Sequence, residues 1–187
     1  MLEKYIIDAQ FYYKSESYRY ILGTVGKNPL IFIGLNPSTA TPKSPDITCC
    51  HLTRLLNTFP TKFDSIILLN LYPFVATKSD NLPKEESSCL DKNMDFIKKV
   101  LKELNDKNKE LNILLGWGSG VKKRKYFKKI LIDLKGILKY YESISKFYYS
   151  KSENKNYPLH PIRYKKNSNP LNSKKEFSDI SCFFDIK

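Results

Sequence analysis

The sequence contains little glycine and histidine, and it has no long apolar run. Of its 187 residues, 7 are Gly and 2 are His. No stretch approaches the ~20 apolar residues of a membrane span, and the opening MLEKYIIDAQ carries acids where a signal peptide is apolar. The 4 cysteines form no CxxC pair, which argues against a zinc site or a disulfide framework. We therefore expect a soluble, cytoplasmic protein with reduced thiols and with no metal, cofactor or membrane contact.

What the chain does have is positive charge. Lys and Arg number 32 against 19 Asp and Glu, a formal net charge of +13. Such a surface favours polyanionic partners such as nucleic acid or an acidic protein, although lysine-rich coding from an AT-rich genome explains the same composition. With 41% hydrophobic residues and no Gly-, Pro- or Ser-rich linker, the sequence predicts one domain over 1–187. Its core is expected over about 20–165, followed by a loosely docked tail over 166–187, and we expect a monomer.

Apolar runs and helical periodicity alternate along the chain. Nearly continuous apolar runs predict buried strands over 30–35, 65–71 and 112–117, with a fourth within 143–150. Apolar residues at helical spacing predict helices over 48–56, 90–104 and 122–138. This alternation predicts an α/β fold, namely a three-layer α/β/α arrangement around a four-stranded parallel sheet.

Two polar segments are expected to meet at one edge of that sheet. The run LIFIGLNPSTA ends a strand in Asn36, and the loop YPLHPIRY contains His160. Ligand sites of open α/β sheets gather at the carboxyl ends of the strands. A recess lined by Asn36 and His160 is therefore the first functional hypothesis.

These segments resemble motifs of the uracil-DNA glycosylase superfamily. GLNPSTA stands where that superfamily has GQDPYH or GINPG, and LHPIRYK stands where it has HPSPLS. Between them, SIILLNLYPFVATKSDNL resembles its second strand, and NILLGWGSGVKKRK resembles its LLWGSYAQKKG segment. The same set of motifs also resembles a bacterial domain family of unknown function. The resemblance covers roughly residues 20–165 and implies a uracil-DNA-glycosylase-like fold.

The resemblance implies roles for the first motif. Asn36 matches the position that holds the attacking water, but an asparagine cannot take a proton from water at neutral pH. Ser38 replaces the tyrosine that excludes thymine. The following segment, TATPKSPDITC, lacks the aromatic that stacks on the base, so Tyr72 or Phe74 would have to substitute. A strand-ending turn is the alternative explanation for Asn36 and Ser38.

Asn70, His160 and Asp46 complete the candidate recess. By resemblance, Asn70 pairs with the base edge, and neutral His160 donates a hydrogen bond to the base carbonyl. Their alternatives are a strand-end amide and a surface loop histidine. Asp46 is a candidate for a displaced water-activating base, and an N-cap is its commoner explanation.

Two further segments are candidates for contact with nucleic acid or a protein partner. The basic residues Lys122, Lys123 and Arg124 follow a Gly-rich turn at the predicted start of a helix, where phosphates bind readily. A solvated helix face is the alternative. The loop after His160 lacks the serines and the wedge leucine of HPSPLS, and offers instead Ile162, Arg163 and Tyr164.

The motifs thus predict a uracil-DNA-glycosylase-like protein whose catalytic motifs are degraded. We expect it to lack ordinary uracil excision and to bind DNA or an acidic, DNA-mimicking glycosylase inhibitor protein. The alternatives are an active N-glycosylase for another or modified base, and a nucleotide or nucleoside hydrolase.

Overall fold

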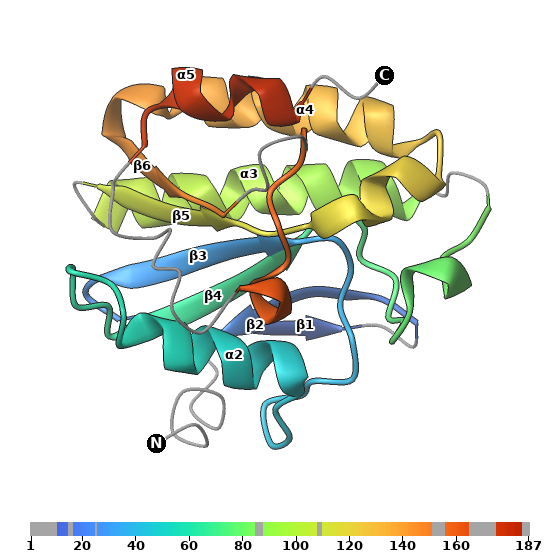
Figure 1. Cartoon of the computed structure of the whole chain (residues 1–187), viewed down its shortest axis with the longest axis horizontal. Helices are drawn as coiled ribbons and strands as arrows, with labels where there is room; N and C mark the ends of the chain where they lie inside the picture. The colour runs from blue at the N-terminus through green and yellow to red at the C-terminus, as the bar shows by residue number, and fades with distance from the viewer. Residues whose placement is uncertain are drawn as a thin grey trace.

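The computed structural model describes residues 11–14, 17–24, 26–84, 88–107, 110–150, 156–164 and 175–184. Within them, the chain forms one mixed sheet with α-helices on both faces (Figure 1). The six strands lie in the order β1-β2-β4-β3-β5-β6. Their bounds are β1 Phe11–Lys14, β2 Arg19–Gly23, β3 Pro29–Gly34, β4 Ser65–Asn70, β5 Leu111–Leu115 and β6 Ser145–Tyr148.

The parallel part of the sheet consists of β4, β3, β5 and β6. These are the four strands that the sequence predicts, and almost every residue in them is buried. The prediction was wrong in strand number, because β2 pairs antiparallel with β4 and β1 pairs antiparallel with β2. The fold class α/β is confirmed, with a mixed, mostly parallel sheet.

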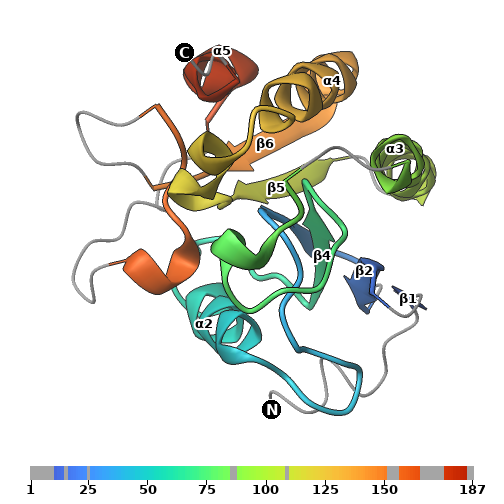
Figure 2. The same cartoon turned by 90° about the vertical axis from the view of Figure 1, so that its right-hand side faces the viewer.

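The helices lie in two layers. Their bounds are α2 Ile47–Leu56, α3 Cys89–Lys107, α4 Phe127–Tyr140 and α5 Phe177–Ile180, with single-turn or short 3-10 helices η1 Ser79–Asn81, η2 Gly118–Lys123, η3 Glu142–Ile144, η4 Pro161–Arg163 and η5 Ser181–Phe183. Figure 2 shows α2 on one face of the sheet and α3, α4 and α5 on the other. None of the helices in the described parts of the chain is long and apolar enough to cross a membrane.

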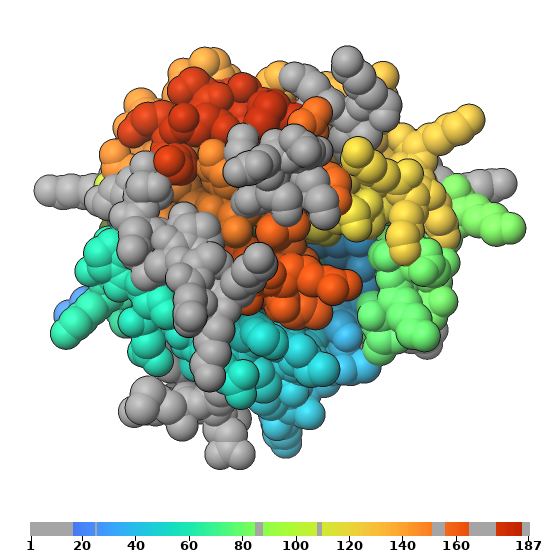
Figure 3. Space-filling model, viewed as in Figure 1, coloured from blue at the N-terminus to red at the C-terminus, as the bar shows by residue number. Residues whose placement is uncertain are grey.

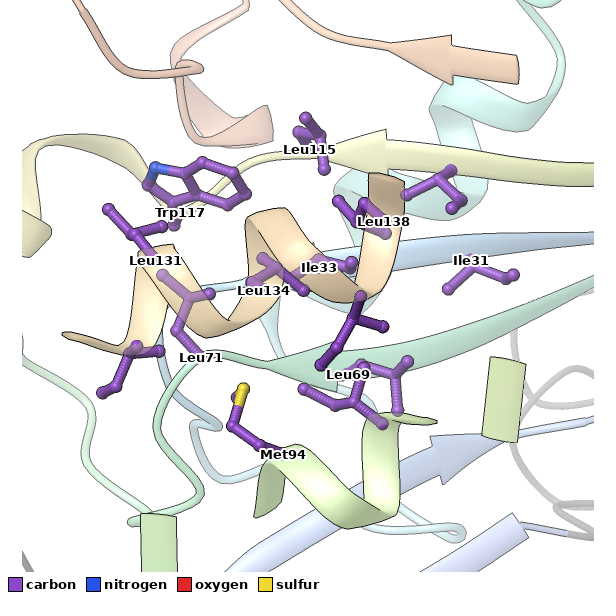
Figure 4. Close-up of a cluster of buried hydrophobic side chains, with 14 of the residues drawn as sticks. Ile31, Ile33, Leu69, Leu71, Met94, Leu115, Trp117, Leu131, Leu134 and Leu138 are labelled. Carbon is purple, nitrogen blue, oxygen red and sulfur yellow. The ribbon is translucent and has the colours of Figure 1, made fainter. Parts of the chain in front are cut away.

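Strand alternation divides the core between the two faces. Side chains of β3, β4 and β5 at alternate positions pack against α3 and α4 in the larger cluster, part of which is drawn in Figure 4. The remaining positions, including Phe32, pack against α2 in the smaller cluster. Consecutive residues of one strand therefore face opposite sides of the sheet.

Two expectations about the ends of elements need correction. The predicted helix over 122–138 is divided into η2 and α4, so α4 begins only at Phe127. The described end of the predicted tail is not loosely docked, since Ile180 and Phe183 are fully buried in the larger cluster. Residues 166–174 and 185–187 of that tail lie outside the described residues.

Candidate functional site

The carboxyl ends of β3 and β5 lie beside three short helices. Figure 2 looks onto this edge, with η1 (green), η2 (yellow) and η4 (orange) in front of the strands. Figure 3 shows a hollow in the surface bordered by these three helices, with the blue β3 region at its floor. After β3 the chain continues through α2 to β4, on one side of β3 in the sheet. After β5 it continues through α4 to β6, in the opposite direction across the sheet. Open α/β sheets bind ligands at such a reversal of strand order.

The ring of Phe32 packs beneath this edge. A Cβ added to Gly34 would lie 2.8 Å from the ring, and one added to Gly116 would lie 2.6 Å from it. Glycine at both positions therefore lets the ring rest directly on the backbones of two adjacent strands. The ring of His160 meets that of Phe32 edge to face, with centroids 6.3 Å apart at 90°.

His160 is held in one orientation at the start of η4. It is the N-cap residue of η4, and its Nδ1 accepts a hydrogen bond from the backbone N–H of Ile162 at 3.4 Å. Burial lowers the pKa of His160 to about 4, against the opposing effect of the Asp46 carboxylate. The imidazole is therefore neutral at pH 7. Because Nδ1 accepts, the proton is on Nε2, which is left as a donor.

Asn70 ends β4 with its amide buried. Only 4% of the residue is exposed, and its Nδ2 has no hydrogen-bond partner in the structure. Its Oδ1 faces Gly34, its register partner on β3. Its backbone carbonyl is held by Asn93 of α3, whose Nδ2 donates to the carbonyls of Asn70 at 2.8 Å and of Leu71 at 3.1 Å. An unpartnered buried donor is costly, which makes this amide a candidate for ligand contact.

Asn36 lies just past the end of β3, and its amide group is already engaged. Its Nδ2 donates to the carbonyls of Ala76 at 2.7 Å and of Pro37 at 2.9 Å. The bond to Ala76 joins the loop after β3 to the loop after β4, and the bond to Pro37 stays within the loop after β3. Only Oδ1 is left for a water, as an acceptor that can orient it but cannot deprotonate it.

Asp46 acts as a helix cap, in line with the commoner explanation for an acid at this place. Its carboxylate accepts from the backbone N–H of Cys49 at 2.9 Å and so caps α2. Burial and this nearby carboxylate raise the pKa of the Cys49 thiol to about 12, so Cys49 stays protonated. Asp46 also lies close enough to His160 to influence its pKa.

The two aromatic residues that were candidates for stacking on a base, Tyr72 and Phe74, pack on the opposite face of the sheet. Tyr72 does not reach the edge, because it is fully buried on the opposite face, where its ring stacks on that of Tyr126 at 5.2 Å. It cannot supply the missing stacking aromatic. Phe74 also packs against that face, beside Tyr18. Ser38 is half-buried in the loop after β3.

Of the three basic candidates, Arg124 is a structural residue. Its guanidinium donates to the backbone carbonyls of Asp80, Leu82 and Pro83 at 2.9–3.1 Å, which fastens the η1 loop to η2. Lys123 pairs with the Asp80 carboxylate at 2.6 Å and lowers the pKa of that carboxyl group. Lys122 is exposed, with its ammonium 5.5 Å from the centre of the Tyr157 ring. None of them lies in the first turn of α4, because α4 begins only at Phe127, and contact of these residues with phosphate stays a prediction.

Replacing Arg124 with glutamine should destabilise the protein by about 2 kcal/mol, because hydrogen bonds from a charged group to four backbone carbonyls are removed. Lys123→Gln is the matched control. It removes an exposed ion pair and should cost less than about 1 kcal/mol. Thermal unfolding of both variants checks this. Equal destabilisation would show that the guanidinium hydrogen bonds add no more to the free energy of unfolding than the exposed ion pair does.

The three residues in and after η4 that were predicted to contact a partner differ in exposure. Ile162 is 44% exposed and Arg163 is exposed. Tyr164 instead packs against the α2 cluster, and burial of its hydroxyl raises its pKa. A partner that docks on η4 would therefore meet Ile162 and Arg163, with Tyr164 as a support beneath them.

Sequence reasoning missed three features of this edge. In the sequence, Phe32 looks like any other core residue of a buried strand. Nothing in the sequence around Gly34 and Gly116 indicates that an aromatic ring packs against both of them. Asn93 could have been noticed, since it is an amide within the apolar stripe of the helix predicted over 90–104. The structure places Asn70, His160 and Asn36 at the same edge. Among the described residues, no cluster of His, Cys, Asp or Glu could hold a metal ion.

The chain matches the family described as "Protein of unknown function (DUF1643)" over residues 19–162. This match spans most of the chain, and the protein belongs to that family. The matched range runs from the start of β2 into η4 and so includes Asn36, Asn70 and His160, whereas Arg163 and Tyr164 lie just beyond it. Neither the curated proteins nor the solved structures provide a significant match.

Proposed function

We propose that this protein is a uracil-DNA-glycosylase-like protein that binds nucleic acid, or an acidic protein that imitates it, and that lacks ordinary uracil excision. The observation that carries this proposal is the pairing of two donors at one sheet edge. Asn70 Nδ2 is buried without a partner, and His160 is neutral with Nε2 as its donor. Two such donors suit a ligand edge that presents acceptors, as the carbonyl groups of a nucleobase do.

The absence of excision rests on the state of Asn36. Fast glycosidic cleavage by water needs a group that takes a proton, and the amide of Asn36 offers only an acceptor oxygen. The aromatic that could substitute for base stacking, Tyr72, is buried on the other face. Positioning of a base would therefore remain while its cleavage is slow.

A second candidate function, an active N-glycosylase for another or modified base, is favoured by Asp46. One carboxylate oxygen caps α2, which leaves the other to accept a proton from water. The helix that Asp46 caps, α2, contacts η4, which begins after His160, and this contact supports a role for the carboxylate at the same edge. This candidate requires excision that is abolished by Asp46→Asn.

The test is binding of a fluorescent single-stranded oligonucleotide over a range of KCl concentrations. We expect micromolar or tighter binding that weakens as salt rises, because binding of phosphates by lysine and arginine releases counterions. Exchanging Lys122 and Arg163 for glutamine should reduce the slope of log K against log salt by about 0.7 for each phosphate that is no longer neutralised. The matched control exchanges Lys62 and Lys107, which are exposed next to the starts of β4 and β5, at the opposite edge.

Excision is measured on the same protein with uracil in U:A, U:G and single-stranded oligonucleotides. We expect little or no release, and no rescue by Asn36→Asp alone, since base stacking would still be missing. Release at the rate of an ordinary glycosylase would refute the loss of excision. Binding that is independent of salt, or equal slopes for the two double variants, would refute a nucleic-acid site at this edge.

A further inference from the structure

An opening in the surface lies away from the candidate site, between α3 and α4 on the other face of the sheet. It is an open groove of about 980 Å³. Met94 of α3 and Ile137 and Tyr141 near the end of α4 are at most 8% exposed and form its apolar base. No feature of the proposed function uses this groove.

The α4 side of the groove presents apolar side chains to solvent. Ile132 is 57% exposed and Tyr140 is 81% exposed, and they are two of only four exposed large hydrophobic residues in the described parts of the chain. Gly136 lies halfway between them on the same helix face, and no atom comes within 4 Å of a Cβ added there. The line from Ile132 to Tyr140 extends about 12 Å. Two apolar anchors thus flank a bare stretch of helix backbone that a partner can approach closely.

The α3 side of the groove carries charge that is partly neutralised. Asp91 pairs with Lys129 at 3.6 Å, and Asp95 pairs with Lys98 at 3.5 Å. Lys99 and Lys102 line the groove, and neither forms an ion pair with another of the described residues. Asp133 on α4 is the one remaining carboxylate of the lining. The later half of the groove, beside Tyr140, therefore carries the unpaired positive charge.

We propose that this groove is a docking site for an acidic amphipathic helix of a partner protein. The apolar face of that helix would cover Ile132, Gly136 and Tyr140, and its carboxylates would lie over Lys99 and Lys102. Grooves between two helices recognise a third helix through apolar side chains at helical spacing. A second copy of this chain fits poorly, because each copy has a net charge of +13 and would bring further lysines to the groove.

The proposal is tested with a synthetic helix of about 18 residues, with Leu and Phe on one face and Glu on the other, labelled with a fluorophore. Binding is measured by anisotropy against the full chain. We expect saturable binding at micromolar peptide, and at least about tenfold weaker binding of a scrambled peptide with the same composition but no helical periodicity.

Two double variants locate the site on the protein. Ile132→Ser with Tyr140→Ser and Lys99→Glu with Lys102→Glu should each weaken binding about tenfold or more. The matched control, Lys27→Glu with Lys62→Glu, changes the same total charge at exposed positions beside the starts of β3 and β4, and should stay within about twofold. All six positions are exposed, and unchanged circular dichroism verifies that each variant is folded.

Three outcomes would overturn the proposal. Equal binding of the ordered and scrambled peptides would show attraction by net charge alone. Equal weakening in the groove variants and the control would place the peptide elsewhere. A dimer in solution that dissociates on changing Ile132 and Tyr140 would make a second copy the occupant. Oligonucleotide binding should be the same for the apolar groove variant and the unchanged protein, so that failure here is separable from failure of the proposed function.

Discussion

Replacing Asn70 with leucine should stabilise the free protein and weaken the nucleic-acid binding that we propose for it. The buried Nδ2 of Asn70 has no partner, and an apolar side chain of similar size removes that unsatisfied donor. We expect the free energy of unfolding to rise by about 1 kcal/mol and Tm to rise by about 2–4 °C for a chain of this size. Oligonucleotide binding should weaken about tenfold, because the variant lacks the hydrogen bond that we propose between Asn70 and the base edge.

Asn93→Leu is the matched control, because it makes the same substitution at an equally buried asparagine. The Nδ2 of Asn93 donates to two backbone carbonyls at the end of β4. Its removal leaves both carbonyls without this donor and should lower the free energy of unfolding by about 2 kcal/mol or more. If the free energy of unfolding rises for Asn70→Leu and falls for Asn93→Leu, the amide of Asn70 is not needed for the fold, whereas that of Asn93 is structural. Destabilisation by Asn70→Leu would mean that the amide is satisfied in the free protein, and the base-edge role would lose its support.

The four parallel strands and three of the helices could be predicted because their signals are local. A strand buried on both faces must be largely apolar, and β3, β4 and β5 are, with Ser65, Asn70 and Asn112 as the polar exceptions. Helix α3 shows the 3.6-residue apolar stripe of a helix covered on one side. The start of α2 could be predicted too, since a carboxylate at Asp46 satisfies the free N–H of Cys49.

The antiparallel strands could not be predicted with the same certainty. Strand β2 places Arg19 in a buried position, where its guanidinium donates to the carbonyl of Ala40 at 2.7 Å. A charged residue in a buried strand breaks the apolar pattern that identified the others. Its partner is an atom of a loop 21 residues away, and such a contact leaves no periodic signal.

The candidate site was predicted in outline, and its side-chain contacts were not. Parallel strands bring Asn36 and Asn70 to one edge whatever their contacts are. Whether an aromatic near that edge faces a ligand depends on a single step of strand register. Tyr72 follows β4 by two residues and turns to the α3 side, whereas Phe32 turns to the α2 side and meets His160. Arg124 has the sequence pattern of a phosphate ligand, but the η1 loop supplies carbonyls for its guanidinium.

Lowering the pH from 8 to 4 should destabilise the protein through His160 by about 3 kcal/mol. The pKa of this imidazole is about 4 in the folded state and 6.5 as its ordinary value. The unfolded chain therefore takes up a proton below about pH 6.5 that the folded chain refuses until about pH 4. The contribution of His160 to the free energy of unfolding is complete above pH 6.5, falls as the pH is lowered from 6.5 to 4, and is lost below pH 4. Each unit of difference between the two pKa values corresponds to about 1.4 kcal/mol.

His160→Asn isolates this effect from the titration of carboxylates. Asparagine does not titrate, and its side-chain oxygen can still cap η4 in place of Nδ1. The difference in unfolding free energy between the unchanged protein and this variant should move by about 3 kcal/mol in favour of the variant from pH 8 to pH 4. With only 2 histidines in the chain, an NMR titration in which His51→Asn provides the assignment measures the pKa directly. Parallel stability curves and a pKa near 6.5 would mean that water reaches the imidazole. His160 would then be partly charged near neutral pH, and it could not serve as the fixed neutral donor that the proposed base recognition requires.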